Sequence, residues 1–173
     1  MTEKFVQEME TQFGSDEALG VYFITDDGQE RLSLAQFNEL AAQYDNPGDM
    51  PGMQSYLADG GSAVCCTDYA ATIYRQLERG RVQIFGFANE DNPTSRCARE
   101  EYHPGGHDFA VVDQRFIVDP WPRLVAGVFD QMVFDLEDPT EGQLALDIYG
   151  PRSCWKWMSA AERHAEETRH CGV

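Results

Sequence analysis

Residues 60–80 read GGSAVCCTDYAATIYRQLERG, and this stretch carries the strongest structural signal in the chain. Small residues open it, and apolar side chains then recur at helical spacing from Cys66 onward, which predicts a helix that begins at Cys66 and stops at Gly80. A helix N-terminus carries free N–H groups and a partial positive charge, and both stabilise a thiolate. The sequence therefore predicts that Cys66 is a nucleophile whose neighbouring N–H groups can also receive an oxyanion.

A second stretch supplies a base for this nucleophile. Residues 106–120 read GHDFAVVDQRFIVDP, two apolar runs separated by residues 113–115, which predicts a tight hairpin. His107 and Asp119 then lie near the same end of the ladder, and counting from the turn places both side chains on one face of the sheet. We expect an imidazole–carboxylate hydrogen bond, with His107 as the base and Asp119 as the acceptor that orients it.

These two stretches resemble the conserved parts of transglutaminase-like domains in the papain-like cysteine protease superfamily. Residues 66–70 (CTDYA) and 74–80 (YRQLERG) resemble their cysteine helix, residues 106–112 resemble their histidine strand, and residues 116–120 (FIVDP) resemble their Asp-Pro strand end. The order of the three catalytic residues is also the same. The resemblance covers about residues 60–122, and related layouts in arylamine N-acetyltransferases and in NlpC/P60 and CHAP amidases leave the subfamily open.

The resemblance implies an α+β, papain-like or transglutaminase-like fold in which the nucleophile helix packs on an antiparallel β-sheet. It also implies a Cys66-His107-Asp119 triad and a cysteine-dependent acyl-transfer reaction through a covalent thioacyl intermediate. The reaction could be amide hydrolysis, peptide hydrolysis, deamidation or transglutamination, on a protein, a peptide or a small amide. The alternative is a catalytically inactive domain that keeps the fold and binds a protein through its acidic surface.

The rest of the chain predicts one domain over residues 1–173 with its catalytic core at about residues 60–122, because no repeat or linker interrupts it. Helices are expected at residues 3–13, at 34–43 after a Ser33 cap, and at 159–170. Strands are expected at residues 21–25, 82–88, 124–129 and 132–136. Loops rich in turn-forming residues are expected at residues 46–52 and 89–106.

The chain is strongly acidic, with thirty Asp and Glu residues against thirteen Lys and Arg residues and a net charge of −17. This charge repels nucleic-acid phosphates and anionic membrane surfaces, so we expect neither as a partner. A basic protein partner would suit it, although acidity can also serve solubility alone.

Cysteine usage and hydropathy bear on location. Five cysteines are an odd number with irregular spacing, which favours reduced thiols and a cytoplasmic protein over a disulfide framework. The first fourteen residues lack the apolar run of a signal peptide, and no stretch approaches eighteen apolar residues, so no transmembrane helix is expected.

Three weaker patterns compete with the triad. Ser153-Cys154-Trp155 is similar to the cysteine neighbourhood of papain-type proteases, so Cys154 could pair with His107 in a permuted layout. Six residues could in principle surround zinc, although no Cys-x-x-Cys pair supports this: Cys97, His103, His107, Cys154, His170 and Cys171. Cys65 is expected to be a buried apolar neighbour of the nucleophile. No cofactor is predicted.

Overall fold

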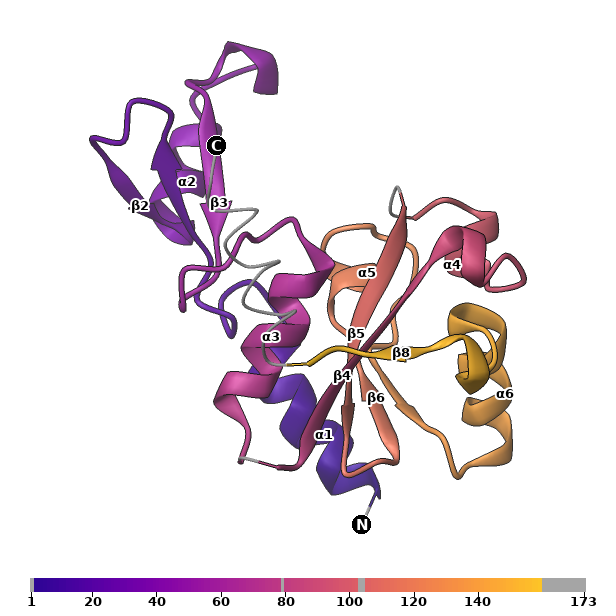
Figure 1. Cartoon of the computed structure of the whole chain (residues 1–173). Helices are drawn as coiled ribbons and strands as arrows, with labels where there is room; N and C mark the ends of the chain where they lie inside the picture. The colour runs from indigo at the N-terminus through magenta and orange to yellow at the C-terminus, as the bar shows by residue number, and fades with distance from the viewer. Residues whose placement is uncertain (1, 79, 103–104, 160–173) are drawn as a thin grey trace.

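Five antiparallel strands form the main sheet in the computed structural model, which describes residues 2–78, 80–102 and 105–159 (Figure 1). The strand order is β7-β6-β5-β4-β8. The bounds are Val82–Ala88 for β4, Gly106–Val112 for β5, Phe116–Val118 for β6, Val133–Asp135 for β7 and Lys156–Trp157 for β8. The predicted strand at 82–88 and the predicted hairpin are confirmed, with Val112 paired to Phe116 across the turn.

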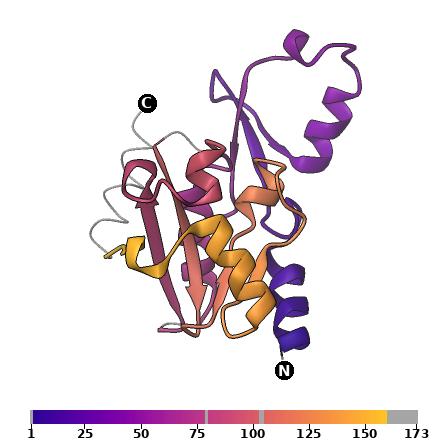
Figure 2. The same cartoon turned by 90° about the vertical axis from the view of Figure 1, so that its right-hand side faces the viewer.

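Helices cover both faces of this sheet (Figures 1 and 2). On one face lie α1, Thr2–Phe13, and α3, Cys66–Gln76; on the other lie α4, Arg96–Arg99, and α6, Pro139–Tyr149. Successive residues of β5 alternate between the two cores, so Ala110 packs toward α3 while Phe109 packs toward α6. The architecture is therefore α+β, with the Cys66 helix packed on an antiparallel sheet as predicted.

A smaller antiparallel sheet projects away from the main one (Figure 1). Its order is β2-β1-β3, with bounds Arg31–Ser33, Tyr22–Thr25 and Met53–Tyr56. Helix α2, Leu34–Ala41, begins at the predicted Ser33 cap, and Gln36 completes a capping box. The rings of Phe23 and Phe37 stack at 3.8 Å and fasten α2 to this sheet. The 3₁₀ turn η1, Pro47–Asp49, lies in the predicted loop at 46–52.

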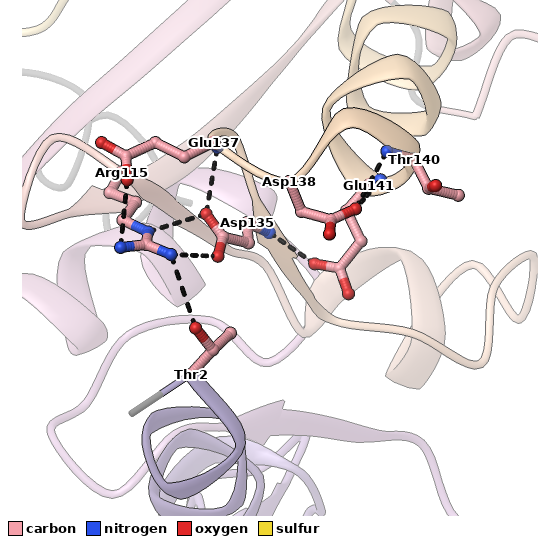
Figure 3. Close-up of polar contacts among 7 residues, drawn as sticks. All are labelled: Thr2, Arg115, Asp135, Glu137, Asp138, Thr140 and Glu141. Carbon is pink, nitrogen blue, oxygen red and sulfur yellow. Dashed lines mark hydrogen bonds and ion pairs between the residues drawn. The ribbon is translucent and has the colours of Figure 1, made fainter.

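A polar network at one end of the main sheet ties the turn before β6, and β7, to α1 and α6 (Figure 3). Arg115 makes a bidentate contact with Asp135, with N···O distances of 2.8 and 2.6 Å, and this contact holds the pKa of Asp135 below its usual range. The backbone N–H of Asp135 donates to the Glu141 carboxylate in the first turn of α6. The network therefore fixes where α6 begins.

Helix α3 is shorter than predicted. It ends at Gln76 instead of continuing to Gly80, because Leu77 already has extended backbone angles (φ −88°, ψ 162°) while its N–H still bonds to the Ile73 carbonyl. Gly80 has a φ of +94°, a conformation that favours glycine, and it lies in the turn into β4 rather than at the helix end.

The predicted strand at 124–129 is wrong. A short helix, α5, occupies Trp121–Leu124, and the Val128 N–H returns to the Pro122 carbonyl. Proline at a first helical position is compatible with a helical turn, and Gly127, with a φ of +65°, ends any extended run. Of the two strands predicted at 124–129 and 132–136, only the second is present, shortened to β7.

The predicted loop at 89–106 contains two short helical turns. They are η2, Asn89–Asp91, and α4, which Ser95 caps by accepting the Ala98 N–H at 3.1 Å. Helix α6 and the following turn η3, Arg152–Cys154, were not expected from the sequence at all. The terminal helix predicted at 159–170 lies, apart from its first residue, outside the described residues.

Candidate active site

Cys66 is the first residue of α3, as the helical spacing predicts. Cys65 precedes it in extended conformation, and the Cys65 carbonyl accepts the Asp68 N–H at 3.1 Å, which starts the helix. Both cysteines are buried, with Cys66 only 4% exposed. The sulfur of Cys66 therefore lies at a helix N-terminus but away from bulk water.

The surroundings of Cys66 favour the neutral thiol. A hydrogen bond with the Cys65 side chain, burial and the negative charge of Asp108 raise the pKa of Cys66 well above its usual value. The backbone N–H of Asp108 acts in the opposite direction, because it donates a hydrogen bond to the sulfur. This N–H places Cys66 beside β5 at the residue that follows His107.

His107 and Asp119 meet as predicted. Nε2 of His107 lies 2.7 Å from Oδ2 of Asp119, and both side chains are almost fully buried. Because a carboxylate only accepts, Nε2 is assigned as the donor and Nδ1 keeps the lone pair of a base. Nδ1 is itself buried and forms no hydrogen bond within the described part of the chain.

The neighbouring residues His107 and Asp108 point to opposite sides of β5, a distinction that the sequence did not reveal. His107 shares its side of β5 with Phe109, and its ring lies 6.0 Å from that of Tyr149 in α6. The side chain of Asp108 points the other way, toward α3, where its Oδ2 accepts the hydroxyl of Thr67 at 2.5 Å. No hydrogen bond joins Cys66 to His107 in the residues that the structure describes.

Trp121 connects the two parts of the site. Its Nε1–H donates to the Val64 carbonyl at 3.0 Å, two residues before Cys66, and its ring centroid lies 5.2 Å from that of His107. Trp121 follows Asp119-Pro120 directly, so one short segment supplies both the acceptor for His107 and the contact with the segment that leads into α3. This places the His107–Asp119 pair and the start of α3 around a common indole ring.

Two further residues of the site were missed. Tyr149, the last residue of α6, donates its hydroxyl to Oδ2 of Asp119 at 2.9 Å, and Asp108 contacts the start of α3. The Asp138-Pro139 pair and the helical spacing of Ala145, Ile148 and Tyr149 could have revealed α6. No sequence signal connects Tyr149 to Asp119 thirty residues earlier.

The weaker candidates lie elsewhere or are described only in part. Cys154 is partly exposed in η3, and Cys65 is buried as predicted. Of the residues proposed for zinc, His103, His170 and Cys171 lie outside the described residues. Within residues 2–78, 80–102 and 105–159, no three His, Cys, Asp or Glu side chains are grouped so as to hold a metal ion.

The described residues also contain no helix that is long and apolar enough to cross a membrane.

The site and fold together define an α+β protein with a buried thiol at a helix N-terminus and a buried imidazole–carboxylate pair whose imidazole lies on the other side of β5 from α3. Comparison of the chain with protein-family models, curated proteins and solved structures finds no match.

Proposed function

We propose that this protein is a cysteine-dependent acyl-transfer enzyme of the papain-like or transglutaminase-like kind, with Cys66, His107 and Asp119 as its catalytic residues. The observation that carries the proposal is the buried His107–Asp119 pair, in which Nδ1 of His107 has no hydrogen-bond partner among the described residues. The next residue along β5, Asp108, contacts the Cys66 sulfur through its backbone N–H. A buried polar atom without a partner is costly in a structural role, whereas a catalytic base needs a free lone pair.

The reaction proceeds from a neutral thiol. As the sulfur attacks a carbonyl carbon, the thiol proton passes to Nδ1 of His107, and the resulting imidazolium is stabilised by Asp119. The oxyanion accepts hydrogen bonds from N–H groups in the first turn of α3. His107 then gives its proton to the leaving amine, alcohol or thiol, and a thioester remains on Cys66.

Water or an amine completes the reaction by attacking this thioester, with His107 removing its proton. Water gives hydrolysis or deamidation, and an amine gives transfer. The substrate class is a protein, a peptide or a small amide. The four cysteines in the described part of the chain form no disulfide, which supports a reducing, cytoplasmic setting for a thiol enzyme.

A second candidate is an inactive domain that binds a basic protein through its acidic surface. Two observations favour it: the raised pKa of Cys66, and the lack of a thiol–imidazole hydrogen bond in the described residues. The net charge of −17 would supply long-range attraction to such a partner.

Acyl trapping separates the two candidates. The protein is mixed with p-nitrophenyl acetate, and acetylated peptides are identified by mass spectrometry soon after mixing. The enzyme proposal expects a burst of p-nitrophenol and an acetyl group on Cys66, lost in Cys66→Ala and strongly reduced in His107→Ala. The matched control Cys65→Ala removes the adjacent thiol and should keep the adduct. A wild-type protein that acquires no acetyl group on Cys66 would contradict the proposal.

A further inference from the structure

Tyr149 reaches the site from α6, an element that the triad does not include. Its side chain is fully buried, and its hydroxyl donates to Oδ2 of Asp119 at 2.9 Å. The same oxygen accepts from Nε2 of His107 at 2.7 Å. One carboxylate oxygen therefore holds both a base and a phenol in place.

The protonation state of the phenol is fixed by its surroundings. Burial, and then the negative charge of Asp119, raise the pKa of Tyr149 well above its usual value. Tyr149 is therefore a neutral hydroxyl donor at neutral pH. Cys97 of α4 also raises the pKa of Tyr149, and Cys97 is itself a buried thiol whose pKa is raised by burial.

Both the backbone and the side chain of Tyr149 are held in place by neighbouring residues. Its backbone carbonyl accepts the side-chain N–H groups of Asn92 at 2.8 Å and Trp155 at 2.9 Å. Its ring packs against Phe109 at 4.7 Å and Phe134 at 5.8 Å. These contacts come from the residues directly after η2 and η3 and from β5 and β7, so the phenol has little freedom to move.

The glycine after Tyr149 allows this arrangement. Gly150 has a φ of +70°, and a Cβ at this position would lie 2.2 Å from Oδ1 of Asn92. Asn92 is fully buried, so it has no room to move away. The end of α6 can therefore approach Asn92 only with glycine at residue 150.

We propose that Tyr149 is a positioning residue of the site: it fixes the Asp119 carboxylate so that His107 keeps Nε2–H on Asp119 and presents Nδ1 as the free base. The catalytic meaning of this role rests on the proposed function. The positioning itself concerns only Tyr149, Asp119 and His107. A hydrogen bond to a charged acceptor is among the stronger ones in proteins, so its loss should be measurable.

The test uses Tyr149→Phe, which removes the hydroxyl and keeps the ring. Protein labelled with ¹⁵N-histidine contains only four such residues, so the Nε2 proton of His107 can be assigned by comparison with His107→Ala. In wild type we expect this proton at low field and in slow exchange with water, as in a buried charge-assisted hydrogen bond. In Tyr149→Phe it should move upfield and exchange faster. Acylation of Cys66 should slow about ten- to a hundredfold, the range that corresponds to losing such a bond.

Tyr69→Phe is the matched control. Tyr69 is also buried, and its hydroxyl donates to a backbone carbonyl, that of Ala63, at 3.1 Å. This variant loses a buried tyrosine hydrogen bond of similar length, but not one to Asp119. The Nε2 proton of His107 should keep its shift, even where the melting temperature falls. An equal change in both tyrosine variants would show a general loosening of the fold and would overturn the proposal.

The outcomes separate the positioning role from the proposed function. If wild-type Cys66 takes no acyl group but the His107 proton responds to Tyr149→Phe, the enzyme proposal fails and the positioning role stands. If Cys66 is acylated at the same rate in both proteins and the His107 proton is unchanged, the positioning role fails alone. If Tyr149→Phe does not fold, wild type decides: a nuclear Overhauser contact between the Tyr149 hydroxyl and the His107 Nε2 proton supports the proposal, and its absence overturns it.

Discussion

The carboxylate of Asp108 restrains the Cys66 thiol, since its negative charge is one of the causes that raise the pKa of Cys66. Asp108→Asn removes that charge, and the amide oxygen can still accept the Thr67 hydroxyl. We predict a lower pKa for Cys66 and, at neutral pH, alkylation by iodoacetamide that is about tenfold faster, which corresponds to about one pKa unit. The rate is measured by peptide mass spectrometry under limiting reagent.

Asp113→Asn is the control for this experiment, because Asp113 lies at the turn beyond the other end of β5 and is paired with Arg81. It removes the same charge without facing Cys66. An alkylation rate in Asp108→Asn that equals that of the control, or falls below it, would show that the carboxylate does not restrain the thiol.

At the residue scale, the sequence predicted contacts within one hairpin and missed contacts between distant segments. His107 and Asp119 could be paired because strand alternation and a short turn fix which residues share a face. The same alternation turns Asp108 toward α3, but the sequence does not show that Asp108 contacts Thr67 and acts on the pKa of Cys66, because these contacts depend on how α3 packs on the sheet. Tyr149 could not be connected to Asp119, because that contact depends on how α6 packs on the sheet.

Helix α6 is the element that carries Tyr149, and its start is defined by side chains. Oδ1 of Asp138 accepts the N–H groups of Thr140 at 2.9 Å and Glu141 at 3.0 Å (Figure 3). Asp138→Ala should lower the free energy of unfolding by about 1 kcal/mol, the usual cost of losing an N-cap. Asp138→Asn keeps a side-chain oxygen for both N–H groups and should cost less.

Urea unfolding of the three proteins checks this prediction. An alanine variant as stable as wild type would show that the cap contributes nothing, and that the Glu141 contact with the Asp135 N–H alone fixes the start of α6.

At the element scale, capping and turn chemistry predicted the Ser33 start of α2 and the hairpin after β5. Apolar composition gave a wrong prediction where the apolar residues did not recur at strand or helix spacing. Residues 124–129 are apolar enough for a strand, but proline at 122 allows a helical turn and glycine at 127 a reversal. The end of α3 at Gln76 also depends on how the chain must turn into β4, which no local pattern specifies.

The whole molecule buries several groups that resist ionisation, and this makes alkaline pH unfavourable. Burial, and then the charge of Asp119, raise the pKa of Cys97 in the folded state. A group whose pKa is higher in the folded state stabilises the fold fully below its unfolded pKa, about 8.5 for a thiol, and this stabilisation is lost progressively as pH rises above that value. The pKa values of Cys66, Tyr69 and Tyr149 are also raised in the folded state, so these groups change the stability with pH in the same direction.

We therefore predict that the free energy of unfolding decreases from about pH 8.5 upward. Between about pH 9 and 10 the slope in Cys97→Ala should be shallower than in wild type by up to about 1.4 kcal/mol per pH unit, the contribution of one proton. Urea titrations at several pH values measure both slopes. Cys154→Ala serves as the control, because that thiol is only partly buried. Identical slopes for Cys97→Ala and wild type would refute this account of alkaline stability.

At the scale of the whole molecule, the central claim is that Cys66 and His107 act together, although they belong to different elements. The most direct test is the rate of Cys66 alkylation against pH, measured with limiting iodoacetamide in wild type and His107→Ala. The account predicts that alkylation at neutral pH is about tenfold slower or more in the variant, because the thiol is neutral there and Nδ1 of His107 takes its proton as the sulfur attacks. The same variant should lose its acylation by p-nitrophenyl acetate. Superimposable pH profiles in two folded proteins would contradict the account, since they would show that the imidazole does not influence the thiol.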